Sequence, residues 1–249
     1  MSNLITVSTD FGYKDWFVAA VKAKIIKINP RARIIDITHN INSHDIRAAA
    51  FLLMCVCRNF PKGTVHLAVV DPGVGSARKP LIIASGGHYF VGPDNGIFSY
   101  VCQRKCDAFT IVRRSPRVSS TFHGRDIFAP VAAKLSSGVK PSTLGVRSER
   151  FLRLTFPAIN KEKRSVRGEV IYIDRFGNLI TNIPNRLMFK RLRIKGRYSM
   201  PVGQCYNRVP AGKLIAVQGS CGYYEIASYK GDAAKITNAK VGTKVGGYF

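Results

Sequence analysis

Strands and helices alternate over residues 4–70, and this alternation most constrains what the chain can fold into. Apolar segments predict strands at residues 4–9, 33–38 and 64–70. The two segments between them carry apolar residues at helical spacing, and we expect Asp15 and Asp45 to cap these helices. A strand–helix order that repeats in this way is typical of a parallel sheet covered by helices.

The pattern changes after residue 80, although the same domain continues. Strands predicted at residues 81–84 and 88–91 flank Gly86-Gly87, which is a strong signal for the turn of a hairpin. A short helix is expected over residues 97–105, followed by a strand at residues 108–112. The sheet is therefore expected to be largely parallel, with an antiparallel part.

Beyond residue 155 the sequence favours short strands and turns, without a helix of useful length. Pro157 and the charged residues 161–164 indicate a linker. We therefore predict an α/β N-terminal domain over residues 1–155, with a largely parallel sheet and flanking helices. A small all-β barrel is expected to form the C-terminal domain, over residues 165–249.

The chain is strongly basic, with a formal net charge of +25. The excess is spread along the chain, because residues 1–155 hold 22 Lys and Arg against 9 Asp and Glu, and residues 156–249 hold 17 against 5. Residues 190–197 alternate basic and apolar side chains, which predicts a strand with one solvated face. We expect weak polyanion binding, while nucleic-acid binding as the main function stays an alternative.

Cysteine spacing and hydropathy indicate the cellular compartment in which such a chain is expected. The cysteines are not arranged at zinc-binding spacing, and we expect all six to be reduced thiols: Cys55, Cys57, Cys102, Cys106, Cys205 and Cys221. No apolar run is long enough to span a bilayer, and the N-terminus lacks the basic region of a signal peptide. The sequence therefore predicts a cytoplasmic protein with no membrane association.

Two carboxylates stand where predicted parallel strands end. Asp10 and Asp71 follow the first and third strands, so both are expected at the same edge of the sheet, where α/β proteins bind ligands. Arg78 and His123 lie on loops that can reach this edge. An Asp, an Arg and a His around one pocket can bind a hydroxyl-bearing ligand or orient a water molecule for attack.

Other readings of these residues have weaker support. Asp10, Asp15, His39 and Asp71 fit no known metal-binding spacing, so we expect no metal site. Residues 73–75, Gly-Val-Gly, lack the third glycine of a dinucleotide-binding motif and the Gly-Lys-Ser/Thr ending of a P-loop. A carboxylate and an arginine that merely stabilise a surface turn remain the structural alternative for the segment around Asp71.

Taken together, the motifs resemble those of the S-adenosyl-L-methionine (SAM) hydroxide adenosyltransferase family, which is related to the fluorinases and chlorinases. The similarity extends over nearly the whole chain, with the motifs in the order of the family. The matching segments are residues 8–12 (STDFG), 36–39 (DITH), 70–75 (VDPGVG) with Arg78, 91–96 (VGPDNG), 121–130 (TFHGRDIFAP) and 174–178 (DRFGN).

The resemblance implies an α/β domain joined to a β-barrel, and a homotrimer with active sites between subunits. It implies that water or hydroxide attacks the ribose C5′ of SAM, releasing adenosine and L-methionine, with no cofactor because SAM is the substrate. The positions that match the catalytic residues of the family are Asp71, Arg78 and His123. The positions that match substrate contacts are Asp10, Asp71, Asp174, Asn178, Ser220, Glu225 and Ser228.

Two alternatives to the hydrolase remain at this stage. One is a SAM-dependent halogenase that forms 5′-chloro-5′-deoxyadenosine. The resemblance argues against it, because the halide-using relatives lack the Asp and His present here at positions 71 and 123. The other is a basic nucleic-acid-binding protein on the same fold, which the net charge would suit.

Overall fold

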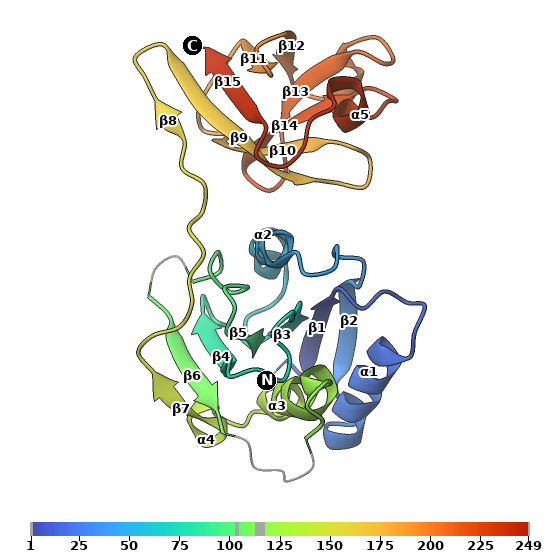
Figure 1. Cartoon of the computed structure of the whole chain (residues 1–249), viewed down its shortest axis with the longest axis vertical. Helices are drawn as coiled ribbons and strands as arrows, with labels where there is room; N and C mark the ends of the chain where they lie inside the picture. Colours follow the sequence, from blue (N-terminus) through green and yellow to red (C-terminus); the bar gives the residue numbers. More distant parts are fainter. Residues whose placement is uncertain (1, 103–104, 113–117, 249) are drawn as a thin grey trace. The chain divides into compact units, whose positions relative to one another are not determined.

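The computed structural model describes residues 2–102, 105–112 and 118–248. The chain forms two compact units, Met1–Thr155 and Phe156–Phe249, here called the N-terminal unit and the C-terminal unit (Figure 1). Each unit has its own hydrophobic core.

The N-terminal unit is built on one sheet with helices packed against it. In the described residues the sheet has seven strands in the order β2-β1-β3-β5-β4-β6-β7. β2, β1, β3 and β5 are parallel, whereas β4, β6 and β7 add antiparallel pairs. The strands are β1 (Leu4–Thr9), β2 (Arg33–Thr38), β3 (Val65–Val69), β4 (Pro80–Ser85), β5 (His88–Pro93), β6 (Asp107–Ile111) and β7 (Gly145–Ser148). The helices are α1 (Phe17–Ile28), α2 (Ile46–Val56), α3 (Ala129–Ser136) and α4 (Pro141–Leu144).

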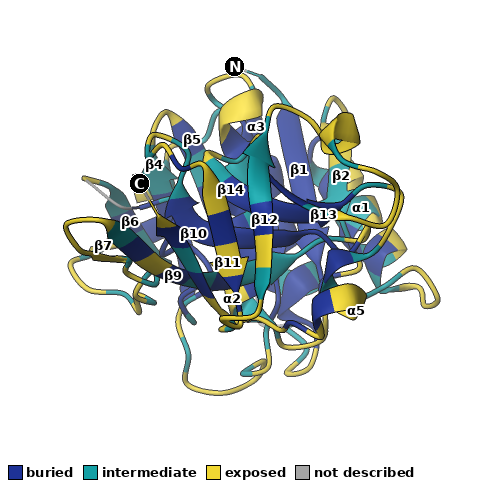
Figure 2. Cartoon of the chain, turned by 90° about the horizontal axis from the view of Figure 1, so that it is seen from above, coloured by how far each residue is buried: buried dark blue, intermediate teal, exposed yellow. Residues whose placement is uncertain are grey.

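The central strands are covered on both faces, which is why they are apolar along their whole length. Every residue of β1 and β3 is buried, and β1 has the colour of buried residues in Figure 2. Such continuous burial is typical of parallel strands between helical layers. In the register of the two strands Thr9 lies beside Val69, so the chain leaves both strands at the same edge of the sheet. The predicted largely parallel α/β fold and the hairpin at Gly86-Gly87 are confirmed.

The two predicted helix caps have different outcomes. Asp45 caps α2, because its carboxylate accepts a hydrogen bond from the Ala48 amide at 2.9 Å. The prediction for Asp15 was wrong: α1 begins after Trp16, and no side chain caps it. Residues 13–16 form a bend and a turn instead. The capping position is therefore Trp16, and Asp15 lies one residue before it.

A predicted helix at residues 97–105 was wrong for the described part of this range, since residues 97–101 form turns. The Asn95 side chain accepts a hydrogen bond from the Ile97 amide at 3.2 Å. Ser99 bonds the Gly96 carbonyl through its amide at 3.0 Å and through its hydroxyl at 2.6 Å. These local side-chain hydrogen bonds compete with helix formation. Residues 103–104 lie outside the described residues.

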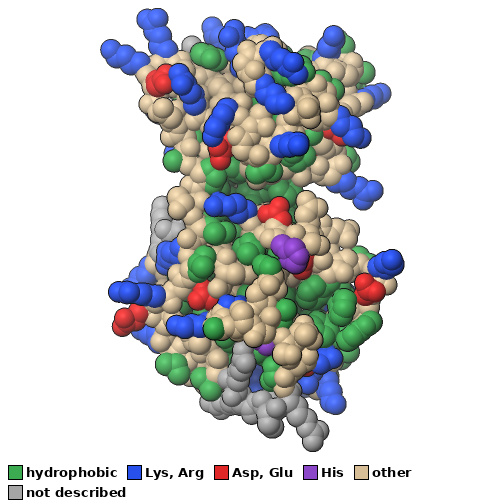
Figure 3. All heavy atoms as spheres, in the orientation of Figure 1, with side chains coloured by type: hydrophobic (Ala, Val, Ile, Leu, Met, Phe, Trp, Pro, Cys, Tyr) green, Lys and Arg blue, Asp and Glu red, His purple; other side chains and the backbone are tan. Residues whose placement is uncertain are grey.

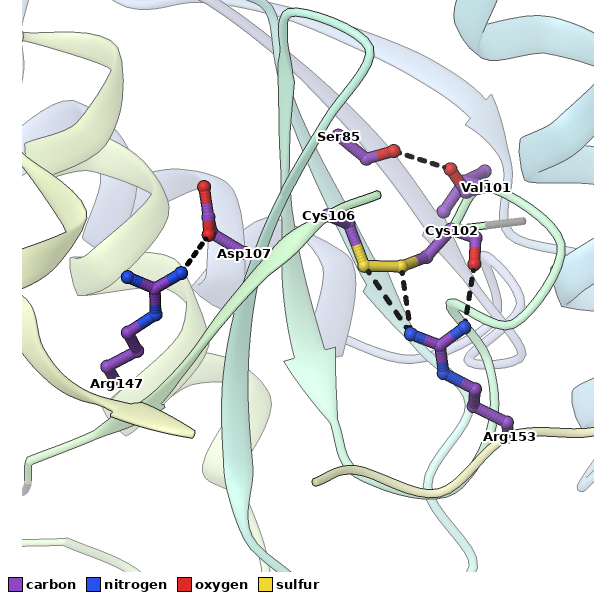
Figure 4. Close-up of a disulfide and its surroundings, with 7 residues drawn as sticks. All are labelled: Ser85, Val101, Cys102, Cys106, Asp107, Arg147 and Arg153. Atoms are coloured by element: carbon purple, nitrogen blue, oxygen red, sulfur yellow. Dashed lines mark hydrogen bonds and ion pairs between the residues drawn. A yellow bond between two sulfur atoms is a disulfide. The ribbon is translucent and has the colours of Figure 1, made fainter. Parts of the chain in front are cut away.

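Cys102 and Cys106 form a disulfide, so the prediction of a reduced thiol was wrong for this pair (Figure 4). Their Cα atoms are 5.8 Å apart, which suits a disulfide. Arg153 lies over the bridge and donates a hydrogen bond to the Cys102 carbonyl at 3.1 Å. Arg153 thus ties the segment that leads out of the N-terminal unit to the two cysteines. Cys55, Cys57, Cys205 and Cys221 are thiols.

The C-terminal unit is a β-barrel, as predicted. Its strand order is β10-β14-β13-β12-β11-β15-β9-β8, and a further pairing of β9 with β10 closes a ring of seven strands within the described residues. Val166, Leu179, Tyr224 and Ile226 are among the residues of its core. The strands are β8 (Asn160–Lys161), β9 (Ser165–Ile173), β10 (Leu179–Pro184), β11 (Arg191–Ile194), β12 (Tyr198–Gly203), β13 (Leu214–Gln218), β14 (Tyr223–Ser228) and β15 (Lys244–Tyr248), with one short helix, α5 (Ala233–Thr237).

The strand predicted within residues 190–197 is β11, and its alternation is confirmed. Arg191 and Arg193 are exposed, whereas Leu192 and Ile194 are buried. Over the part of the chain that the structure describes, no helix combines the length and hydropathy needed to cross a bilayer.

Candidate active site

Asp71 and Arg78 form a buried ion pair just beyond the carboxyl end of β3. The Arg78 Nε donates to Asp71 Oδ1 at 2.9 Å, and Nη2 donates to Asp71 Oδ2, so the contact is bidentate. The exposed fractions of the two side chains are only 6% for Asp71 and 9% for Arg78. A bidentate pair of this kind fixes the plane of the guanidinium as well as its position. The pair is not the surface turn contact that the structural alternative expected.

His123 completes the cluster from a loop 45 residues further along the chain. Arg78 Nη2 lies 2.8 Å from His123 Nδ1, and His123 is 2% exposed. Because a guanidinium can only donate, Nδ1 must be the acceptor, and the neutral ring carries its proton on Nε2. Arg78 Nη1 is buried and has no hydrogen-bond partner among the described residues. The cluster of Asp71, Arg78 and His123 therefore keeps one donor, Arg78 Nη1, for a bound group.

The backbone around the cluster is shaped by close approaches. Gly75 has φ +80°, and a Cβ atom there would come 2.6 Å from the Ser120 carbonyl, so only glycine lets the Asp71 loop lie against the loop before His123. Asn95 donates to the Val70 carbonyl at 2.8 Å and so fixes the end of the strand. Phe128, from the turn of π-helix after His123, lies under the Arg78 guanidinium at 5.1 Å.

Asp10 lies at the same sheet edge, on the loop after β1. This loop contacts the loop of His123, because the rings of Phe11 and Phe122 meet edge to face with their centroids 6.0 Å apart. Asp10 Oδ2 accepts a hydrogen bond from the His44 amide at 3.1 Å. The structure therefore brings Asp10, Asp71, Arg78 and His123 to one edge of the N-terminal unit.

A polar network that sequence reasoning missed supports the Asp10 loop. His39 is fully buried; its Nδ1 lies 2.7 Å from the Thr9 hydroxyl and its Nε2 lies 3.1 Å from Asp36 Oδ1. Its carbonyl accepts a hydrogen bond from the Gly12 amide at 2.7 Å. Burial lowers the pKa of His39, against the opposing effect of Asp36. Neutral His39 thus positions both ends of the Asp10 loop.

In the C-terminal unit, Asp174 and Asn178 form one tight turn between β9 and β10. Asp174 Oδ1 accepts the amides of Phe176 and Asn178, each at 2.9 Å, and Oδ2 accepts Asn178 Nδ2 at 2.9 Å. Gly177 occupies the turn with φ +81°, a conformation that favours glycine. The turn holds Asp174 and Asn178 rigidly, and the Phe176 side chain is 74% exposed.

Glu225, on β14, belongs to the same polar group. Tyr206 donates to Glu225 Oε1 at 2.8 Å. Burial raises the pKa of Glu225, and so does the negative charge of Asp174, whereas the hydrogen bond from Tyr206 lowers it. Burial and Glu225 together raise the pKa of Tyr206 to about 12, so the phenol stays protonated. Tyr206 was not predicted, because a single tyrosine in a loop carries no pattern in one sequence.

The two predicted serines differ in position. Ser220 lies in the turn between β13 and β14, next to Gly219. Gly219 is close to Glu225, because a Cβ atom added at position 219 would lie 3.2 Å from Glu225 Oε2. Ser228 ends β14, and its hydroxyl is buried without a hydrogen-bond partner in the described part of the chain. Ser220 is therefore placed with Glu225, whereas Ser228 lies three residues further along β14.

Comparison with protein families gives two matches that together cover most of the chain. The SAM hydroxide adenosyltransferase N-terminal domain matches residues 5–145, and the C-terminal domain of the same family matches residues 168–246. The boundary between the two matches falls at the junction of the two compact units.

Curated proteins and solved structures agree with these matches. An (R)-S-adenosyl-L-methionine hydrolase from Thermus thermophilus is 37% identical over 251 residues, covering 95% of this chain and 96% of that protein. A fluorinase from Nocardia brasiliensis is 23% identical, covering 97% of this chain and 95% of its own length. The crystal structure of an uncharacterized conserved protein from Thermotoga maritima superposes with a TM-score of 0.92 at 36% identity, covering 97% of this chain and 98% of that chain.

Proposed function

We propose that this chain, which belongs to the SAM hydroxide adenosyltransferase family, hydrolyses SAM to adenosine and L-methionine. The family resemblance predicted from the motifs is confirmed, and so is the relation to the fluorinases. The full-length similarity to (R)-SAM hydrolases supports water rather than halide as the second substrate.

The observation that carries the proposed mechanism is the buried cluster of Asp71, Arg78 and His123. Its groups stand at the carboxyl edge of a largely parallel sheet, which is the usual ligand edge of such folds. The buried Arg78 Nη1, which has no hydrogen-bond partner among the described residues, is a donor open to a ligand, and the His123 ring carries a second N–H at Nε2. Both suit an oxygen atom that acquires negative charge.

The chemistry needs a nucleophile more than it needs an acid. In SAM the sulfonium already carries the positive charge, so the C5′–S bond breaks with its electron pair moving to sulfur and leaves neutral methionine. A new C5′–O bond forms from water or hydroxide, and one proton of the water is released overall. We assign to the protein the task of holding the oxygen in line with the C5′–S bond in a site with little water.

Within this mechanism the three residues take different parts. Arg78 and His123 donate to the attacking oxygen and so stabilise its hydroxide character. Asp71 holds the guanidinium in plane through its bidentate contact, and its charge offsets that of Arg78. Asp71 also remains our candidate, with Asp10, for contacts to the ribose hydroxyls.

The remaining substrate contacts come from the C-terminal unit. Glu225 and Asp174 carry negative charge that suits the methionine ammonium group, and Asn178, Ser220 and Ser228 supply hydrogen-bonding groups. We propose that the protein forms a homotrimer in which the N-terminal unit of one subunit and the C-terminal unit of the next build each site together.

Product analysis tests the reaction. The purified chain is incubated with SAM, without and with a high concentration of chloride, and the nucleosides are separated by chromatography. Equal amounts of adenosine and methionine, independent of chloride, are expected. Formation of 5′-chloro-5′-deoxyadenosine in the chloride sample would instead establish a halogenase, and the absence of any nucleoside product would refute both enzymes.

Subunit complementation tests the shared site. An inactive variant of the N-terminal unit, His123→Ala, is mixed with an inactive variant of the C-terminal unit, Glu225→Ala, under conditions that exchange subunits. If each site takes residues from two subunits, the mixture regains part of the activity, because some sites then contain neither substitution. Sites formed within one chain would stay inactive in every mixture.

A further inference from the structure

The outer face of the barrel carries a pocket that the proposed reaction does not use. It has a volume of about 460 Å³ and lies over β9, β15 and β11. Its charged and aromatic lining is Arg167, Glu169, Arg193, Lys244 and Tyr248. None of the residues that line it is among those assigned to SAM, and in the ring of strands β11 and β15 each lie three strands from β14, which carries Glu225. The pocket is therefore separate from the residues assigned to SAM.

The strand register explains the shape of this pocket. Gly246 of β15 lies directly opposite Arg167 of β9 on one side and Arg193 of β11 on the other. Directly opposed residues project from the same face of a sheet, so two arginines flank a position that has no side chain. Their backbones are about 10 Å apart, two strand spacings. The Tyr248 ring lies over this position, 3.7 Å from where a Cβ of residue 246 would stand, so the result is a basic groove with a tyrosine on its floor.

The charges of the pocket are only partly neutralised from within. Lys244 pairs with Glu169, and Arg167 lies 3.4 Å from Glu162 although its side chain is 70% exposed. Among the described residues Arg193 has no carboxylate within ion-pair distance. Its guanidinium instead lies over the Tyr248 ring at 5.4 Å, and Tyr248 is 48% exposed.

Further basic side chains extend this positive face beyond the pocket. They are exposed and lie on the two hairpins at its borders: Lys161, Lys163, Arg164, Arg191, Lys195 and Arg197. The space-filling view shows Lys and Arg side chains around the part of the C-terminal unit in which β8, β9 and β15 lie (Figure 3). Basic side chains on this face therefore come from more than one strand.

We propose that this groove binds single-stranded nucleic acid. Rows of exposed Lys and Arg suit a phosphate backbone, and an exposed aromatic ring beside an arginine suits the face of an unpaired base. The absence of a side chain at Gly246 makes room for the Tyr248 ring on the floor of the groove. A duplex hides the base faces that Tyr248 would contact, which is why the single-stranded form is the ligand.

Fluorescence anisotropy with labelled oligonucleotides of about twelve residues, RNA and DNA, tests the groove at physiological salt. The double variant Arg167→Ala/Arg193→Ala is compared with Lys27→Ala/Lys134→Ala, which removes the same charge from exposed helix positions of the N-terminal unit. We expect the groove variant to bind about ten-fold more weakly. The slope of log K against log salt concentration should become shallower by about 1.4, because two phosphate contacts are lost. Equal weakening in both variants, or no binding of either oligonucleotide by the unchanged protein, would overturn the proposal.

A second variant separates base stacking from charge. Tyr248→Ala keeps every cation of the groove, so it is expected to weaken oligonucleotide binding about ten-fold while inorganic polyphosphate binds as before. If polyphosphate binding falls as much as oligonucleotide binding, the groove recognises phosphate alone and the proposal fails.

Folding and catalysis provide the controls for both variants. The circular dichroism melting curves should match that of the unchanged protein, because Arg167, Arg193 and Tyr248 are exposed. SAM hydrolysis is expected to continue at the unchanged rate in the groove variants. The proposal does not depend on the proposed function, since oligonucleotide binding and product formation are measured separately.

Discussion

Arg78 donates to both carboxylate oxygens of Asp71 and, through the same Nη2, approaches Nδ1 of His123. Two buried side chains from different loops are therefore oriented by one guanidinium. The positive charge of Arg78 is balanced only by Asp71 within this group, so the ion pair and the position of His123 depend on each other.

Replacing Asp71 by Asn is expected to remove activity and to lower stability. The variant leaves the buried Arg78 charge without its counter-ion, which typically costs about 3–5 kcal/mol of unfolding free energy. Urea unfolding measures this cost, and the initial rate of adenosine formation measures the loss of activity. Asp107→Asn is the matched control, because it breaks an ion pair with Arg147 that is largely exposed and should cost less than about 1 kcal/mol.

The stability of the protein is expected to fall as the pH decreases below about 6.5. Burial, helped by His88, lowers the pKa of His66 to about 3 in the folded chain, whereas the unfolded chain binds a proton near pH 6.5. The unfolded state therefore holds more protons between these values, and stability is lost as pH falls, by about 1.4 kcal/mol per pH unit.

His66→Gln tests the origin of this slope, because the amide does not titrate. Urea unfolding at a series of pH values should show a shallower loss of stability in this variant. His44→Gln, at an exposed loop position, should keep the slope of the unchanged protein. An unchanged slope in His66→Gln would assign the acid sensitivity to other groups, of which buried His39 is the first to test.

Hydropathy patterns were sufficient to predict a largely parallel sheet with flanking helices and the barrel that follows. They succeed because β1 and β3 are buried on both faces and β11 is buried on one. The buried positions of these strands therefore carry apolar residues, which the sequence shows directly. The turns at residues 97–101 and the disulfide of Cys102 with Cys106 could not be predicted in this way. Both depend on local side-chain contacts that leave no periodic pattern.

The candidate site was predictable to a different extent in its two halves. Asp10 and Asp71 follow strands, so the parallel sheet places them at one edge. The contact of Arg78 with His123 spans 45 residues and needed the structure. Tyr206 and the network around His39 were missed, because Tyr206 meets Glu225 19 residues away and His39 meets Thr9 30 residues away.

Gly177→Ala is expected to damage the turn that holds Asp174 and Asn178. A Cβ atom at position 177 would overlap the Asp232 carboxylate, in addition to the strain of φ +81°. Gly212→Ala is the matched control, since φ is +78° there but nothing lies within 4 Å, and it should cost only about 1 kcal/mol. Gly177→Ala should cost more in urea unfolding and should also raise KM for SAM, whereas the control leaves KM unchanged.

At low pH the KM for SAM is expected to rise as Glu225 is protonated, and we call this rise the acidic limb of the KM profile. Tyr206→Phe is expected to move the acidic limb to higher pH. The Tyr206 hydroxyl donates to Glu225 and so lowers the pKa of that carboxyl, against burial and the charge of Asp174. Without this hydrogen bond the pKa of Glu225 rises further, and Glu225 is protonated at a higher pH. If its carboxylate holds the methionine ammonium group, SAM binding weakens wherever Glu225 becomes neutral.

Three variants measured over the same pH range decide whether Glu225 acts in this way. Glu225→Gln should raise KM and abolish the acidic limb, because no carboxylate remains to titrate. Tyr198→Phe removes a hydroxyl that bonds the Ile236 carbonyl at 3.0 Å, away from Glu225, so its limb should stay in place. An unmoved limb in Tyr206→Phe would contradict the assignment, since a group that binds the ammonium must respond to the loss of its hydrogen-bond donor.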